Sequence, residues 1–180
     1  MRLFVAIQLP DDVQNYLLSL QKLFMNAGEI TFVKESHLTL KFLGEVSPFV
    51  AKQVEDKLSV IKPDKFKVKL FGLGVFPDEK LAKVLWVGLN PENETIALQQ
   101  KIDVVLKDFF PPEKNFKPHI TIGRIKSLTN KKSFLTCIKK TKIKDLGFEV
   151  DSFALVKSEL SFNSPEYFVL KDFKSQKNRK

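Results

Sequence analysis

Two stretches of this sequence, His37-Leu38-Thr39-Leu40 and His119-Ile120-Thr121-Ile122, share one pattern and contain both histidines of the 180-residue chain. In an extended strand, successive side chains point to opposite faces. Each stretch therefore turns its His and Thr to one face and its two aliphatic residues to the other. The pattern predicts two strands that bury their aliphatic residues in a core while the imidazole and the hydroxyl face an open surface.

The repetition of the His-x-Thr-x pattern is more informative than either copy. A single His followed by apolar, Thr and apolar residues most often marks an ordinary strand. Its occurrence at both histidines favours a shared function. Two such strands side by side would place two imidazoles and two hydroxyls around one small space, which is an acid–base pair with two hydrogen-bond donors for an anion.

Cations follow each motif. Alternation places Lys41 on the face of His37 and Thr39, where it could help to hold a phosphate; a solvent-facing lysine is the alternative. In the second strand, strict alternation would turn Arg124 into the core, where an unpaired charge is costly. Gly123 permits a bulge that would return the guanidinium to the polar face, and arginine is suited to bidentate phosphate binding.

The hydrophobic pattern predicts an α+β protein with an internal repeat. Each half has a helix, a His-Thr strand, a second helix and a pair of strands, which implies two similar lobes with the His strands at the centre. No linker-like segment separates the halves, so residues 1–180 are expected to form one two-lobed domain. Helices are expected after Pro10, capped by Asp11 or Asp12, and after Ser47. Two further helices are expected over 98–109 and 133–143, and strands over 2–9, 30–33, 37–46, 66–76, 83–89, 116–125, 150–160 and 167–173.

Composition restricts the class of protein. With 43% hydrophobic and 28% charged residues, a single cysteine and no signal-like or membrane-spanning segment, the chain is expected to be globular and cytoplasmic. The net charge of +9 suggests a polyanionic partner such as nucleic acid, although a merely well-solvated surface would explain it too. Residues 174–180 are expected to form a flexible basic tail.

Several other mechanisms fit the sequence poorly. The sequence has neither a P-loop nor a G-x-G-x-x-G fingerprint, and no His/Cys cluster that could ligate a metal. Cys137 lies in a lysine-rich helical segment far from either motif in sequence, so a cysteine nucleophile is not expected. Two histidines, hydroxyls and cations without a metal point to phosphodiester chemistry by acid–base catalysis.

The chain resembles the 2H phosphoesterase superfamily, specifically the RNA 2′,3′-cyclic phosphodiesterases once named 2′-5′ RNA ligases. The resemblance is carried by residues 1–7, 37–46 and 116–124, of which the last two are specific. It implies a bilobal, duplicated fold of two antiparallel-sheet lobes with outer helices and a central cleft. Phe32 departs from the family pattern, where Trp is frequent, as does Ser164-Pro165, where Gly-Pro is common.

The resemblance also implies a reaction, the hydrolysis of an RNA 2′,3′-cyclic phosphate to a 2′-phosphate without metal or cofactor. On that model His119 is the base and His37 the acid, while Thr39, Thr121 and Arg124 hold the phosphoryl oxygens. The residues themselves do not distinguish acid from base. Reversal of the reaction would give 2′-5′ ligation, and a noncatalytic RNA- or nucleotide-binding module using the same cleft is the alternative function.

Two aromatic residues are further candidates for substrate binding. Phe4 lies on the strand face opposite Leu3 and Val5, where it could stack on a base; packing beneath another element is the alternative. Tyr167 is the second candidate. The expected partner is RNA with a 2′,3′-cyclic phosphate end, or a related small nucleotide. The protein is expected to be a monomer that does not bind membranes.

Overall fold

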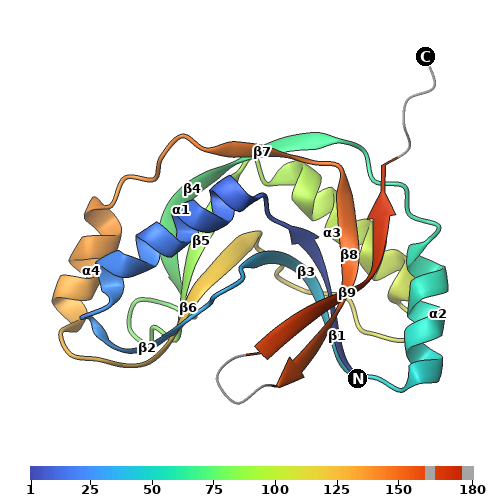
Figure 1. Cartoon of the computed structure of the whole chain (residues 1–180), viewed down its shortest axis with the longest axis horizontal. Coiled ribbons are helices and arrows are strands. Elements are labelled where there is room, and N and C mark those ends of the chain that lie inside the picture. Colours follow the sequence, from blue (N-terminus) through green and yellow to red (C-terminus); the bar gives the residue numbers. More distant parts are fainter. Residues whose placement is uncertain (161–164, 176–180) are drawn as a thin grey trace.

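The computed structural model describes residues 1–160 and 165–175, and in this part of the chain nine strands form one curved antiparallel sheet (Figure 1). Their order is β7-β4-β5-β6-β3-β1-β8-β9, and β2 pairs with β6. The strands are β1 (Arg2–Gln8), β2 (Gly28–Phe32), β3 (His37–Glu45), β4 (Phe66–Phe76), β5 (Val84–Asn90), β6 (His119–Leu128), β7 (Gly147–Val150), β8 (Ser152–Leu160) and β9 (Pro165–Lys174).

The helices begin near the predicted positions. The Ser47 hydroxyl caps the helix that starts at Pro48, accepting a hydrogen bond from the Val50 N–H at 3.2 Å. The predicted Asp cap of the first helix is wrong, because Pro10 occupies the cap and both aspartates lie in the first turn. Carboxylates there still complement the helix dipole. The helices are α1 (Asp11–Gln21), the 3₁₀ turn η1 (Lys22–Phe24), α2 (Pro48–Leu58), α3 (Asn93–Leu106) and α4 (Lys131–Lys140).

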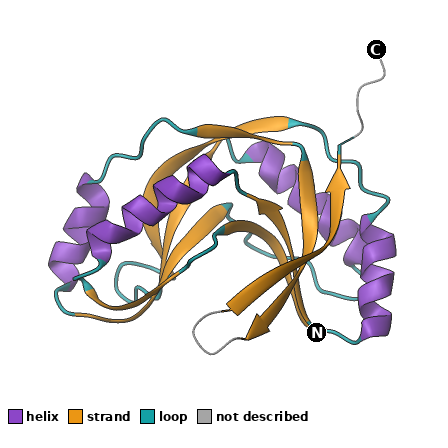
Figure 2. Cartoon of the chain, viewed as in Figure 1, coloured by secondary structure: helices purple, strands orange, loops and turns teal. Residues whose placement is uncertain are grey.

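A single bridge, between Leu38 of β3 and Ile120 of β6, joins two halves of the sheet. One half contains β3, β1, β8 and β9, with α3 against β3 and α2 against α3. The other contains β6, β5, β4, β7 and β2, with α1 against β6 and α4 against β4 (Figure 2). The prediction of two antiparallel lobes with outer helices and central His strands is confirmed. The lobes are not the two sequence halves, however, because β1 lies between β3 and β8 and so joins N-terminal strands to the C-terminal pair β8 and β9.

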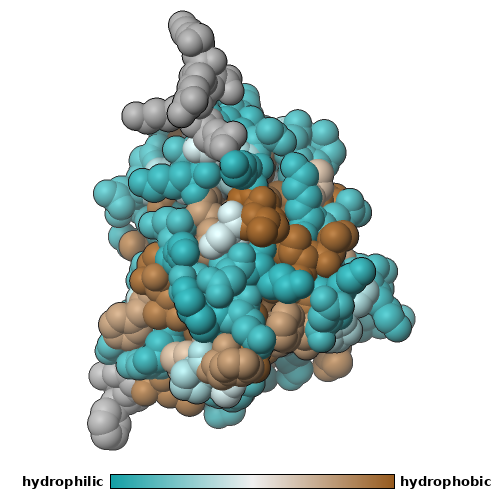
Figure 3. All heavy atoms as spheres, turned by 90° about the vertical axis from the view of Figure 1, so that its right-hand side faces the viewer, coloured by the Kyte–Doolittle hydropathy of each residue, from teal (hydrophilic) through white to brown (hydrophobic). Residues whose placement is uncertain are grey.

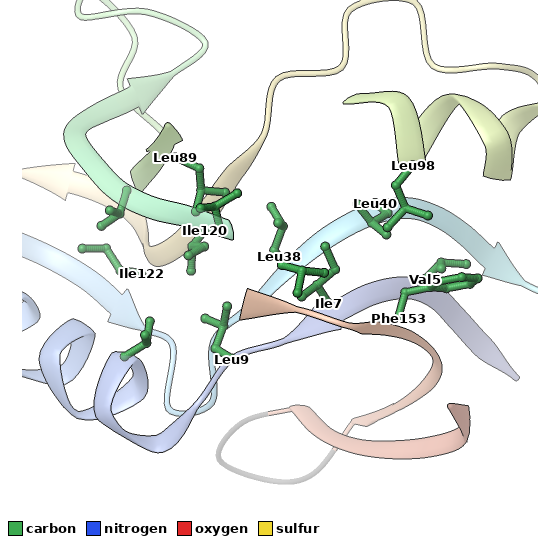
Figure 4. Packing of buried hydrophobic residues seen from close by; sticks show 14 of the residues in the cluster. Val5, Ile7, Leu9, Leu38, Leu40, Leu89, Leu98, Ile120, Ile122 and Phe153 are labelled. Carbon is green, nitrogen blue, oxygen red and sulfur yellow. The ribbon is translucent and has the colours of Figure 1, made fainter. Parts of the chain in front are cut away.

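The hydrophobic core continues from one lobe into the other beneath the His strands. Leu38, Leu40, Ile120 and Ile122 are all at most 1% exposed. Figure 4 shows Leu40 facing Leu98 of α3, with the other aliphatic side chains of the two strands in the same core. The apolar face of each motif is therefore buried as the alternation predicts, which leaves its other face free for polar side chains.

The outer side of the molecule is largely polar. Figure 3 shows hydrophilic residues over most of the side that carries α2, with hydrophobic side chains exposed between them.

The C-terminal strand ends later than expected: Lys174 pairs with Ser152, and the Ser175 N–H donates to the Asp151 carbonyl at 2.7 Å. The tail boundary at residue 174 is therefore wrong, and residues 176–180 lie outside the described part.

The helices were also compared with the length and hydropathy that a membrane span requires. Over 1–160 and 165–175, no helix is both long and apolar enough to span a bilayer.

Candidate active site

The Leu38–Ile120 bridge sets the positions of the two imidazoles. In an antiparallel pair with this register, His37 lies opposite Thr121 and Thr39 opposite His119. The two histidines are then diagonal neighbours on one face, which in a regular ladder corresponds to about 7–8 Å. Both imidazoles therefore lie on the face of the sheet that the two threonines share.

A cavity of about 760 Å³ opens on this face of the sheet. His37, Thr39, Thr121 and Arg124 all line it. His119 is half-buried beside Phe76 and is not part of the lining. The structure therefore brings four of the five predicted catalytic and phosphate-binding residues to one cavity, whereas His119 lies outside its lining.

A bulge brings Arg124 into this cavity. The pairing of β5 with β6 skips Ile122, so Ile122 and Gly123 are both buried and Arg124 returns to the open face. A Cβ on Gly123 would lie only 3.0 Å from the Ile30 side chain, so a larger residue would disturb β2. The expectation that Gly123 turns the guanidinium toward the site is confirmed in its geometry.

The predicted position of Lys41 is wrong. The pairing of β1 with β3 skips Leu40, so Lys41 turns inward and is 2% exposed. Its Nζ donates to Asp103 Oδ1 at 2.5 Å and to the Pro111 carbonyl at 2.7 Å. Phe42, 63% exposed, takes the place on the cavity that alternation assigned to the lysine.

The Lys41–Asp103 pair is a buried structural link between β3 and α3. Burial by itself would raise the pKa of the Asp103 carboxyl, but hydrogen bonds from Lys41, from Gln99 and from the Glu113 N–H hold that pKa below its usual range. The carboxylate is therefore charged at neutral pH and fully occupied by partners within the fold.

Phe4 lies against His37 in the lining of the cavity. It is 3% exposed, and its ring is stacked on the His37 imidazole with centroids 4.6 Å apart. Tyr167 meets the edges of both rings, at 4.9 Å from His37 and 5.5 Å from Phe4. Phe4 and half-buried Tyr167 both line the cavity, and their roles in substrate binding stay predictions.

The environment of His37 favours the neutral imidazole. Burial, and secondly the nearby Arg124 guanidinium, lowers the pKa of His37 from 6.5 to about 4, although a hydrogen bond to the Glu35 carbonyl opposes the shift. His37 is therefore neutral at pH 7 in the empty site.

His119 has a matching backbone contact. Its Nδ1 donates to the Lys117 carbonyl at 2.7 Å, which leaves Nε2 as the acceptor of the neutral ring. Burial lowers the pKa of His119, and the Lys117 charge adds to this effect while the hydrogen bond opposes it. Phe76 contacts the ring edge-on at 4.8 Å, and Trp86 lies at 6.3 Å.

Sequence reasoning missed several residues of the cavity. Phe42, Phe32 and Phe168 line it, as does Arg2 at the start of β1. Arg2 could have been predicted from the sequence, because strand alternation places it on the same face of β1 as Phe4. Phe42 carries none, since its direction depends on the bulge at Leu40. Over 1–160 and 165–175, no three His, Cys, Asp or Glu side chains gather where they could hold a metal ion.

Comparison with known proteins identifies the family. The model of the 2′-5′ RNA ligase superfamily matches residues 19–161. The chain belongs to this superfamily. A Methanocaldococcus jannaschii protein named RNA 2′,3′-cyclic phosphodiesterase is 36% identical over 176 residues, which cover 96% of this chain and 100% of that protein. An Aquifex aeolicus protein of the same name is 36% identical, with 76% of each chain covered.

Solved structures of other proteins share the fold of this superfamily member. The crystal structure of TT0787 of Thermus thermophilus has a TM-score of 0.80 at 27% identity and covers 97% of each chain. Escherichia coli LigT complexed with ATP has a TM-score of 0.74 at 26% identity and covers 98% of each chain. The sequence-based prediction of an enzyme of this family, with its two-lobed fold, is therefore confirmed.

Proposed function

We propose that this superfamily member hydrolyses RNA 2′,3′-cyclic phosphate ends to 2′-phosphates. The observation that carries the proposal is the Leu38–Ile120 bridge, because it turns both His-x-Thr pairs to the same face of the sheet. The name shared by the curated relatives supports the substrate class. The Arg124 guanidinium in the cavity supplies the positive charge that a phosphodiester requires.

The proposed reaction uses the two imidazoles in different roles. His119 Nε2 removes a proton from water, whose oxygen attacks phosphorus. The bond from phosphorus to O3′ breaks, and protonated His37 delivers its proton to O3′. The products are a 3′-hydroxyl and a 2′-phosphate. His119 suits the base because the Lys117 carbonyl fixes the tautomer with a free Nε2.

The electrostatics of His37 suit the acid. Its pKa of about 4 in the empty site means that the proton must be taken up together with the anionic substrate, whose charge offsets that of Arg124. Once protonated, an imidazole with a low intrinsic pKa gives its proton readily to the departing oxygen. Arg124, Thr39 and Thr121 are then placed to stabilise the charge that builds up on the phosphoryl oxygens.

The proposed reaction needs no metal ion, since two imidazoles and a guanidinium provide the base, the acid and the positive charge. The same groups would join a 2′,3′-cyclic phosphate end to a 5′-hydroxyl end in a 2′-5′ linkage, with His119 deprotonating the 5′-hydroxyl in place of water while O3′ departs with the proton of His37. We propose this ligation as the reverse of 2′-5′ bond cleavage by the same pair.

A single assay tests the proposal. The purified protein is incubated with an oligonucleotide that ends in a 2′,3′-cyclic phosphate, with EDTA present, and the product end is determined by mass and by its sensitivity to phosphatase. We expect a 2′-phosphate and an undiminished rate in EDTA. A protein that binds this oligonucleotide without converting it would instead be a noncatalytic RNA-binding module, and strict dependence on a divalent ion would contradict the mechanism.

A further inference from the structure

The cavity beside His37 extends well beyond the predicted phosphate-binding residues. Arg2 lines its far part, at the start of β1. Ala6, on the same face of β1, pairs with Thr39. Since an antiparallel strand rises about 3.4 Å per residue, the Cα of Arg2 lies about 14 Å along β1 from the residue beside Thr39. An arginine side chain that extends from this Cα toward Thr39 leaves a distance between its guanidinium and Thr39 of roughly the length of one nucleoside unit.

The carboxylates nearest to Arg2 along the sheet are engaged elsewhere. Glu45, its pairing partner on β3, is 3.3 Å from the Met1 amine, and Glu159 on β8 pairs with Lys157. Glu166 also lines the cavity, but across residues 1–160 and 165–175 no ion pair joins a carboxylate to Arg2. The guanidinium therefore presents a positive charge to the cavity without a partner among the described residues.

Aromatic side chains occupy the space between this arginine and the catalytic residues. Tyr167 borders His37, and Phe42 lies opposite Phe4 on β3 with 63% of its surface exposed. Burial, and to a smaller extent the Glu35 carboxylate, raises the pKa of Tyr167, while the positive charges of Arg124 and Arg2 oppose the shift, so this tyrosine lies within electrostatic reach of both cations. A cation at each end and aromatic rings between them match a phosphate–nucleoside–phosphate unit.

We propose that Arg2 binds a second phosphate, the one on the 5′ side of the nucleoside whose 2′ and 3′ oxygens carry the reacting phosphate. The inference rests on the proposed function and narrows its substrate class. The preferred substrate is an RNA chain end or a 5′-phosphorylated nucleotide, and a nucleoside 2′,3′-cyclic phosphate without the 5′ phosphate is a poorer one. The planar guanidinium can contact two oxygens of that phosphate at once.

Lys34 is the rival cation for this second phosphate, because it also lines the cavity. It lies next to Glu35 in the turn between β2 and β3, and Glu35 faces the same cavity. That carboxylate is adjacent in sequence to Lys34 and would repel a phosphate bound there, whereas the two sheet carboxylates closest to Arg2 are neutralised by other cations and Glu166 lies on β9, two strands away from β1. The observations therefore favour Arg2.

Binding of two product-like ligands tests the proposal without turnover. Isothermal titration calorimetry compares adenosine 2′-phosphate with adenosine 2′,5′-bisphosphate. We expect the wild-type protein to bind the bisphosphate about tenfold more tightly, the scale of a partly solvated charge-assisted contact. In Arg2→Gln this preference should vanish, while Arg2→Lys should retain part of it. Lys67→Gln removes the same charge from an exposed site on β4 outside the cavity and should keep the full preference.

Each result supports or overturns the assignment. Equal wild-type affinities for the two ligands, or an undiminished preference in Arg2→Gln, would overturn it. Loss of the preference in Lys34→Gln but not in Arg2→Gln would also overturn it by moving the second phosphate to the turn. Equal thermal unfolding midpoints of the variants exclude a folding defect. A protein that shows the Arg2-dependent preference but hydrolyses no cyclic phosphate would refute the proposed function and leave the two-phosphate site in place.

Discussion

The two histidine strands, β3 and β6, have the same backbone geometry but supply different chemistry. In each strand the pairing with a neighbour skips the residue that follows Thr, which is Leu40 in β3 and Ile122 in β6. After this bulge the next residue turns inward and the one after it faces the cavity. Two copies of one structural unit therefore meet at the Leu38–Ile120 bridge with matched His and Thr positions.

The residues after the bulge make the site asymmetric. The inward position holds Lys41 in β3, where it reaches Asp103, and Gly123 in β6, where the β2 side chains cover it. The cavity position holds Phe42 in β3 and Arg124 in β6. In the reaction proposed above, one imidazole is the base and the other the acid. The different residues beside the two motifs give the two imidazoles different surroundings.

The largest expected effect comes from the histidines, where the two strands are most alike. His37→Ala and His119→Ala should each lower kcat on a cyclic-phosphate-ended oligonucleotide by about 100- to 10,000-fold, the scale of a lost acid or base. Steady-state rates and a double variant measure this. Because the two groups act in one reaction, the double variant should lose little more than the worse single variant. Full activity in both single variants would remove the two strands from catalysis.

Lys41→Met tests the inward position of β3. The substitution leaves the Asp103 carboxylate without its cation inside the fold, which should cost about 3 kcal/mol of unfolding free energy in urea denaturation. The rate of the folded variant should remain close to wild type, because Lys41 points away from the cavity. Lys52→Met, which removes two ion pairs of an exposed lysine on α2, should change stability little. A large loss of rate with unchanged stability would place Lys41 in the cavity after all.

Arg124→Lys tests the cavity position of β6. Lysine keeps the charge but loses the planar fork that contacts two phosphoryl oxygens, so kcat/KM should fall by about tenfold, and Arg124→Gln should cost about 100-fold. Initial-rate measurements against substrate concentration give both values. If lysine were nearly silent in rate and in stability, Arg124 would only brace the surface.

The pH dependence of kcat/KM distinguishes the effect of the Arg124 charge on the His37 pKa from the effect of its phosphate contacts on the rate. Below both histidine pKa values the base is protonated, and above both the acid is lost, so kcat/KM should be bell-shaped. Burial lowers both pKa values, that of His37 to about 4, so the maximum should lie below pH 6.5. Arg124→Gln removes a charge that lowers the His37 pKa, so the limb due to His37 should move to higher pH. Arg124→Lys should leave that limb nearly in place.

The smallest effect is expected at Phe42, the counterpart of Arg124 in β3. Phe42→Ala removes an exposed ring from the cavity, so affinity for a nucleotide should fall about threefold by loss of stacking. Affinity for inorganic phosphate should not change. Titration calorimetry with both ligands measures the difference, and equal losses for the two would assign Phe42 a purely structural role.

Much of the fold and the site is readable from the sequence. Alternation in His37-Leu38-Thr39-Leu40 and its counterpart predicts the buried and the polar faces, because side chains of a strand point alternately whatever it pairs with. The Ser47-Pro48 cap is equally local, since the hydroxyl bonds a backbone group three residues away. Gly123 marks the place where alternation fails in β6. No glycine marks the corresponding failure at Leu40, which is why the predicted direction of Lys41 is wrong.

Residue types and the period of a strand are enough to indicate the family, the shared face of each His-Thr pair and the apolar face beneath it. Contacts between segments far apart in the chain are needed for the rest: which strands form a lobe, where the ladders skip a residue, and that the Phe4 ring stacks on His37. No local pattern encodes these contacts. The lowered pKa of His37 has the same origin, since it results from burial and from a guanidinium 87 residues away along the chain.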